Sequence, residues 1–160
     1  MKIWLSLLAF ALVGCSSDPT PVVTQYQLAV SAEKTINPSA NNSTNPVVVR
    51  LYQLTDAQQF KQLPFIDLYN DDVSLLGANL VSKQVLPVVM PDSNSKQTLD
   101  INKTTQYIGV LVEFAEYDAS TATVVTTTPQ EEEQYIQLKI SGNKAALQTV
   151  TPDSPWWDVF

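Results

Sequence analysis

The segment Val47-Val48-Val49-Arg50-Leu51-Tyr52-Gln53-Leu54 constrains the architecture more strongly than any other part of the chain. It is rich in β-branched residues, and only Arg50 and Gln53 interrupt its apolar character. A strand that faces water on one side alternates apolar and polar residues, whereas a strand covered on both faces is an almost unbroken apolar run. The segment therefore predicts a strand that is buried on both faces or lies in the core of a sandwich.

The flanking segments carry strand, helix and turn patterns. Upstream, apolar residues alternate with polar ones from about residue 25 to 33, which is typical of a half-buried strand. Downstream, Thr55-Asp56 is a possible N-cap, Pro64 ends one helix and starts another, and Asp71-Asp72 precedes a third helical pattern that reaches Leu80. Further strands are predicted at about residues 84–90, 97–101, 107–117, 135–140 and 144–150. Residues 119–128 are either an edge strand or a mobile loop.

These elements predict a mainly β protein, a two-sheet β-sandwich with seven or eight short strands and a small helical insertion after the second strand. The sandwich domain is expected at residues 25–150, with the insertion at about 55–80. A tail at 151–160 contains Trp156-Trp157, which is open to three interpretations: contact with a membrane interface, contact with a partner, or packing on a sheet edge.

The N-terminus has the layout of a secretory signal. Lys2 precedes an apolar run from Ile3 to Val13, which is too short for a transmembrane helix of about 20 residues. Leu12-Val13-Gly14-Cys15 resembles the lipobox of bacterial lipoproteins, which implies removal of residues 1–14 and acylation of Cys15. Residues 15–24 then form the lipidated cysteine and a proline-containing tether. Ser16 follows the cysteine where aspartate typically retains lipoproteins in the inner membrane, which implies the outer membrane, on its periplasmic side.

Composition excludes several classes of function. Removing residues 1–14 leaves 146 residues with 8 basic and 16 acidic side chains, so the net charge is −8 and nucleic-acid binding is not expected. Cys15 is the only cysteine, so no disulfide is expected. The chain has no histidine, which excludes a Ser-His-Asp arrangement and removes the commonest zinc ligand. We predict a protein that is not an enzyme and that needs no metal or cofactor.

Several motifs together resemble the TssJ family (VasD/SciN-like) of type VI secretion lipoproteins. They are Ile36-Asn37-Pro38, Pro46 to Leu54, Phe60, Asp67-Leu68, Tyr107-Ile108-Gly109-Val110-Leu111-Val112 and Tyr117-Asp118. The chain departs from the family at Glu116-Tyr117-Asp118, where a basic residue is common, and the resemblance assigns no role to Trp156-Trp157. The resemblance implies a transthyretin-like sandwich anchored in the outer membrane. It also implies a partner, the periplasmic C-terminal region of the inner-membrane protein TssM.

The resemblance further implies that the loop between the first two strands binds this partner. In this sequence the expected contact residues are Asn37, Pro38, Ser39, Ala40, Asn41, Asn42, Ser43, Thr44 and Asn45. Their side chains offer many hydrogen-bond donors and acceptors, as adaptable binding loops do. The segment lacks the aromatic and arginine residues that usually dominate interfaces, and a plain connecting loop is the alternative interpretation.

Other candidate sites favour structural roles. Arg50 is expected to pair with a carboxylate such as Glu113 or to end at the surface. Asp67, Asp71 and Asp72 are either a cation site or, as we expect, a solvated helix face. The segment from Asp92 begins like a calcium loop but lacks the required glycine and closing glutamate. A sandwich lipoprotein that binds a small ligand or envelope polymer is the alternative function, and a hydrolase is disfavoured.

Overall fold

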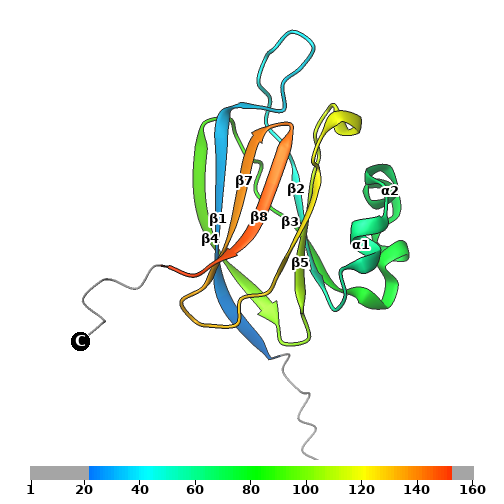
Figure 1. The fold of residues 1–160 in the computed structure, drawn as a ribbon, viewed down its shortest axis with the longest axis vertical. Helices are drawn as coiled ribbons and strands as arrows, with labels where there is room; N and C mark the ends of the chain where they lie inside the picture. The colour runs from blue at the N-terminus through cyan, green and yellow to red at the C-terminus, as the bar shows by residue number, and fades with distance from the viewer. Residues whose placement is uncertain (1–21, 153–160) are drawn as a thin grey trace, which may run out of the picture.

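The computed structural model describes residues 22–152, which form two four-stranded sheets packed face to face (Figure 1). One sheet has the strand order β4-β1-β7-β8 and the other β3-β2-β5-β6. Neighbouring strands are antiparallel except for β1 and β7, which are parallel. The prediction of a mainly β two-sheet sandwich is confirmed. In chain order, the strands are β1 (Val23–Ile36), β2 (Val49–Leu54), β3 (Leu80–Val85), β4 (Ser93–Asn102), β5 (Tyr107–Val112), β6 (Thr123–Thr127), β7 (Tyr135–Gly142) and β8 (Lys144–Val150).

Strand β2 is covered on both faces, as its sequence predicts. Val49 and Leu51 belong to the core between the two sheets, whereas Tyr52 and Leu54 belong to a second core on the opposite face of their sheet. All four side chains are at most 1% exposed. Full burial of one such side chain contributes about 1.5–3 kcal/mol to stability. Because the strand buries side chains on both of its faces, it stabilises both cores.

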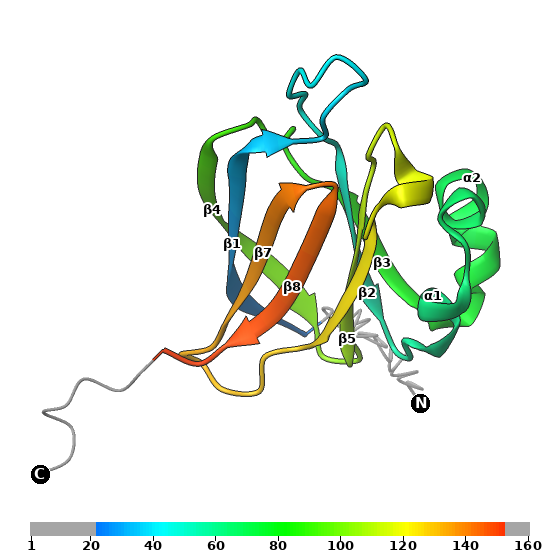
Figure 2. The same ribbon diagram turned by 45° about the horizontal axis from the view of Figure 1, so that its top comes forward.

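The second core lies under a small helical layer on the outer face of the β3-β2-β5-β6 sheet (Figure 2). The layer consists of α1 (Gln58–Gln62), α2 (Phe65–Leu76) and the 3-10 helix η1 (Gly77–Asn79). The predicted helical insertion after the second strand is therefore confirmed. The N-cap position of α1 is Ala57, and the preceding Asp56 accepts a hydrogen bond at its Oδ1 from the amide of Gln58 at 2.8 Å.

Gly109 in β5 makes the close approach of α1 possible. A Cβ atom at this position would lie 2.9 Å from two ring carbons of Phe60. The Phe60 ring is fully buried and packs at 5.2 Å from the ring of Tyr52. The glycine within the apolar run of β5 is therefore explained by packing.

The helical insertion differs from the prediction at its C-terminal end. The predicted break before the third helical pattern is present within α2, where Asp71 has non-helical dihedral angles (φ −144°, ψ 41°) and a kink separates two helical segments, but the second segment ends at Leu76. Helix α2 ends at Gly77, whose dihedral angles (φ 49°, ψ −123°) lie in a region that glycine adopts at much lower cost than other residues. Leu80 starts β3 instead of ending a helix, so the strand predicted at residues 84–90 lies earlier, because its pairing partner is β2.

Two other strand boundaries differ from the sequence pattern. Strand β1 continues to Ile36 after a register irregularity between Ala32 and Ile36. Strand β5 ends at Val112, and the rest of the predicted run turns into the 3-10 helix η2 (Tyr117–Ala119). The open question about residues 119–128 is resolved, because β6 pairs with β5 as an edge strand.

Gln53 protects the free edge of β4. Its Nε2 donates to the carbonyl of Asp100 at 2.8 Å, and its Oε1 accepts from the amide of Asn102 at 2.9 Å and from the hydroxyl of Thr105 at 2.9 Å. Gln53 is only 6% exposed and links the two sheets. One buried amide thus replaces part of a neighbouring strand on an edge that would otherwise be open to pairing.

The described residues, 22–152, contain both hydrophobic cores and the eight strands named above. Within this range no helix is long and apolar enough to cross a membrane. The leader, Cys15, Ser16 and the Trp156-Trp157 pair lie outside the described residues.

Candidate protein-binding site

The loop from Asn37 to Pro46 joins β1 to β2 and projects from one end of the sandwich (Figure 1). The chain enters the domain at the opposite end, at residue 22 (Figure 1). Strand β1 has 14 residues and runs between the two ends. At about 3.3 Å per residue, it separates the loop from the start of the domain by roughly 40 Å.

We call Asn37 and Asn45, which lie near the two ends of the loop, the neck of the loop. Asn37 holds the first of these two ends in place. Its backbone has a φ of 45°, a left-handed conformation that asparagine tolerates better than most residues. Its Nδ2 donates to the carbonyl of Pro46 at 3.0 Å, and its Oδ1 accepts from the amide of Ala115 at 2.8 Å. Its own amide donates to the carbonyl of Gly142 at 3.0 Å. Asn37, which is only 6% exposed, therefore joins the loop to the connection after β5 through its side chain and to the end of β7 through its backbone amide.

Asn45 holds the second end of the loop in place. Its amide donates to the carbonyl of Ile36 at 3.2 Å. Its Nδ2 donates to the carbonyls of Asn37 at 3.0 Å and Ser43 at 3.1 Å. These bonds hold the two ends of the loop side by side.

The tip of the loop is a compact turn. The amide of Ser39 donates to the carbonyl of Ser43 at 2.9 Å, and the amide of Asn42 donates to the carbonyl of Ser39 at 2.8 Å. The residues exposed to solvent at the tip are Ala40, Asn41, Asn42, Ser43 and Thr44. The nine residues singled out by the resemblance thus divide into three groups: Asn37 and Asn45 shape the neck, Pro38 and Ser39 are half-buried, and residues 40–44 form the exposed tip.

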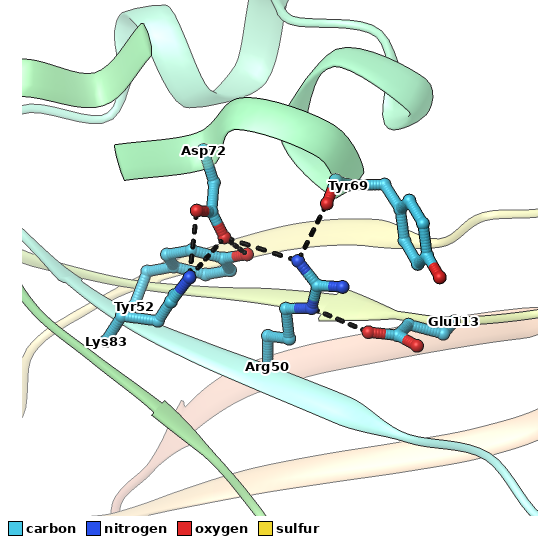
Figure 3. A network of polar contacts seen from close by, with 6 residues as sticks. All are labelled: Arg50, Tyr52, Tyr69, Asp72, Lys83 and Glu113. Carbon is cyan, nitrogen blue, oxygen red and sulfur yellow. Dashed lines mark hydrogen bonds and ion pairs between the residues drawn. The ribbon is translucent and has the colours of Figure 1, made fainter. Parts of the chain in front are cut away.

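A second polar cluster holds α2 against the sheet (Figure 3). The predicted pairing of Arg50 with Glu113 is confirmed, with 2.6 Å between Nε and Oε1. The Nη1 of Arg50 also donates to the carbonyl of Tyr69 at 2.9 Å, and the guanidinium lies 4.7 Å from the centre of the Tyr69 ring. Arg50 therefore cross-links β2, the residue that follows β5, and α2.

Asp72 is the buried centre of this cluster. Its carboxylate accepts from Tyr52 at 2.7 Å and from Lys83 at 2.9 and 3.0 Å, and Arg50 Nη1 lies 3.4 Å away. Burial opposes ionisation of Asp72, but the hydrogen bonds from Lys83 and Tyr52 and the charge of Lys83 outweigh this effect and lower its pKa. Burial and the hydrogen bond to Asp72 raise the pKa of Tyr52.

The expectation of a solvated acidic face is therefore correct for Asp67 and Asp71, which are exposed, and wrong for Asp72, which is 5% exposed. The kink at Asp71 turns Asp72 toward the sheet. Among residues 22–152, no group of three or more histidine, cysteine, aspartate or glutamate side chains could hold a metal ion. Sequence reasoning missed Lys83 and Tyr52 as partners of Asp72 because no local pattern links them.

Comparison with known proteins identifies the family that the chain resembles. Residues 24–143 match the family model described as "Type VI secretion lipoprotein, VasD, EvfM, TssJ". No curated protein matches the chain.

Solved structures resemble the fold. The crystal structure of the T6SS lipoprotein TssJ1 from Pseudomonas aeruginosa is 20% identical, with a TM-score of 0.74 over 84% of this chain and 100% of that one. Lip from Serratia marcescens, described as a membrane-bound component of the type VI secretion system, is 21% identical, with a TM-score of 0.69 over 77% of this chain and 96% of that one. A chain in a structure described as the T6SS protein TssM C-terminal domain (869–1107) from EAEC is 22% identical, with a TM-score of 0.61 over 79% of this chain and 98% of that one. At these identities the likeness concerns the fold.

Proposed function

This chain belongs to the type VI secretion lipoprotein family that includes TssJ and VasD, and from this premise we propose that it links the outer membrane to an inner-membrane partner. In this proposal the protein is a non-catalytic component of the secretion membrane complex. Its partner is the periplasmic C-terminal region of a TssM-like protein, and its attachment to the outer membrane is a lipid on Cys15.

The position of the loop is the observation that carries the proposal. The polar tip at residues 40–44 projects from the end of the sandwich opposite residue 22, where the tether from Cys15 joins the domain (Figure 1). A lipid-anchored chain entering at one end presents the other end to the periplasm. The neck bonds of Asn37 and Asn45 hold the tip in one conformation before binding, which reduces the entropy lost on association.

The sequence before the domain supports the proposed lipid anchor. One acyl chain binds a membrane only marginally and reversibly, whereas two or more, at about 0.8 kcal/mol per buried CH₂ group, hold a protein stably. Acylation of the thiol and of the new amine at Cys15 would supply such an anchor. Load would then pass from the lipid through the tether and β1 to the loop and its partner.

The partner is tested with a soluble chain of residues 16–160 and the periplasmic region of the TssM-like protein from the same genome, by calorimetry. A variant with Ser39–Thr44 replaced by a Gly-Ser segment of equal length retains Asn37 and Asn45, so the neck is preserved. A matched control replaces Glu131-Glu132-Glu133, in the connection that enters β7, with Gly-Ser. We expect binding by the wild type and the control and at least tenfold weaker binding by the loop variant. Equal binding by all three would refute the role of the loop, and no binding by the wild type would refute the partner.

The anchor is tested in cells. We expect labelled palmitate in the wild type but not in a Cys15→Ser variant, and wild-type protein in the outer-membrane fraction. A Ser16→Asp variant keeps the lipid but should move to the inner membrane. An unlabelled wild type would refute the anchor, and a Ser16→Asp variant that stays in the outer membrane would refute the role given to Ser16.

A further inference from the structure

Four planar groups stack in a row beside the start of α2. The ring of Tyr117 in η2 lies 4.7 Å from the ring of Phe65, the Phe65 ring lies 5.8 Å from that of Tyr69, and the Tyr69 ring lies 4.7 Å from the guanidinium of Arg50. The planes of the first two pairs are inclined by only 12° and 20°. Figure 3 shows the Tyr69 end of this row, where the ring stands beside Arg50 and Glu113.

Two adjoining hollows follow the row. One, of about 430 Å³, lies between Pro64–Ile66 and the segment from Tyr117 to Thr123. The other, of about 280 Å³, is lined by Phe65, Ile66, Tyr69, Glu113, Phe114 and Tyr117. We call the two together the aromatic groove, defined by Phe65, Ile66, Tyr69 and Tyr117. Ile66 is 42% and Tyr69 41% exposed, so neither side chain completes a core of this domain.

Most of the charged residues next to the groove are acidic. Asp118 lines it, and Asp67 and Glu116 adjoin Ile66 and Tyr117 in the sequence, whereas Lys144, which bridges to Thr121, is basic. The three acidic side chains are exposed, and none of them forms an ion pair within residues 22–152. Glu113 forms an ion pair with Arg50, so neither of these two charges is free to attract a ligand. A ligand that fits both the walls and the rim of the groove is therefore apolar at its centre and basic at its edges.

The groove is continuous with the loop described above. The amide of Ala115 donates to Oδ1 of Asn37 at 2.8 Å, and Ala115 directly follows Phe114 in the groove wall. The neck of the loop and one wall of the groove are therefore joined by a hydrogen bond. In Figure 1 the η2 turn, in yellow, lies at the end of the sandwich from which the loop projects and faces α2.

The loop tip alone is too small for a stable interface. Specific complexes bury about 800 Å² on each partner and involve about 20–30 residues a side. Their binding energy is concentrated in a few aromatic or arginine residues near the centre. The tip has five exposed residues and no aromatic side chain, whereas the groove, which adjoins the neck of the loop, supplies the three partly exposed rings of Phe65, Tyr69 and Tyr117.

We propose that the aromatic groove receives an apolar side chain flanked by lysine or arginine from the same protein that binds the loop. This inference rests on the proposed function, because the occupant is a segment of that partner. The loop tip provides polar contacts at the edge of the interface, and the groove provides its apolar anchor.

The test compares two single substitutions in α2. Ile66→Asn removes an exposed apolar side chain that lines the groove, and Val73→Asn makes the same kind of change at a residue that is 56% exposed and lies outside it. In the calorimetric assay with the soluble chain, we expect Ile66→Asn to raise the Kd at least tenfold and Val73→Asn to change it less than twofold. Circular dichroism melts check that both variants fold.

A second pair of substitutions tests the charge. Asp118→Lys reverses a charge on the groove rim, and Glu132→Lys makes the same change in the connection that enters β7. Association at low salt should slow at least threefold for Asp118→Lys only, and the difference should shrink as salt is added. Equal rates for the two variants would show that the partner is not steered by this rim and would overturn the basic character assigned to it.

The outcomes separate this inference from the proposed function. If the wild type binds, the loop variant is weak and Ile66→Asn binds normally, the groove is not part of the interface although the partner is right. If the wild type does not bind, the partner is wrong and the groove assignment fails with it. Amide NMR signals of residues 65–69 and 114–123 that do not move when wild-type chain is saturated would also overturn the groove, independently of any variant.

Discussion

Replacing Asp72 with asparagine should destabilise the domain by about 3 kcal/mol, since each hydrogen bond to a charged group contributes about 1.5–3 kcal/mol. The change removes a charge that is 6% exposed and leaves Lys83 facing an amide that also carries donors. Two considerations limit the loss. Lys83 is 31% exposed and can regain water, and Arg50 keeps its bond to Glu113. For a domain of about 130 residues, 3 kcal/mol corresponds to a fall of roughly 10 °C in Tm.

The penalty should depend on pH. The pKa of Asp72 is lower in the folded state than in the unfolded state, where it is about 3.9. Its ionised form therefore stabilises the fold at all pH values above the unfolded pKa, and this contribution is lost as pH falls through the folded pKa. The difference between wild type and Asp72→Asn should be constant from about pH 5 to 8 and should shrink below about pH 4.

Urea unfolding at several pH values measures both effects. Asp71→Asn is the matched control, because Asp71 is the preceding residue, is exposed and forms no ion pair within the described residues. We expect less than about 0.5 kcal/mol for the control, as for most surface substitutions. An Asp72→Asn variant as stable as Asp71→Asn at pH 7, or a loss that stays the same at pH 3, would refute the account of the buried carboxylate.

Three further substitutions test other parts of the fold. Gly109→Val should cost about 2 kcal/mol or more in urea unfolding, because its Cβ would meet the Phe60 ring at 2.9 Å; an unchanged midpoint would contradict this packing. Gln53→Leu should cost about 2–3 kcal/mol and speed exchange of the β4 amide that Gln53 caps, since that group loses its partner; unchanged exchange would show that water replaces it. Asn37→Ala should cost about 1–3 kcal/mol and speed amide exchange in the loop, whereas Asn41→Ala, at the exposed tip, should do neither; similar effects would contradict the division into neck and tip.

Much of the fold follows from local patterns. The apolar run of β2 predicts its burial on two faces because every residue in it has to be covered by something. Pro64 predicts the break between the two helices because it fixes φ and lacks an amide donor. The boundaries at Ile36, Leu80 and Val112 were harder to predict, because each depends on which strand lies beside it.

The leader pattern, the apolar segments, the polar composition of the first loop and the family could be inferred without a structure, since these depend on residue types and their spacing along the chain. Which distant groups meet depends on the folded chain. The amide of Ala115 reaches Asn37 across 78 residues of sequence, and Asp72 meets Tyr52 and Lys83 from two different strands. The aromatic groove likewise forms from α2 and the connection after β5. Hydrogen bonds and ring contacts act over a few ångströms, so only strand register and helix packing can bring such residues within reach.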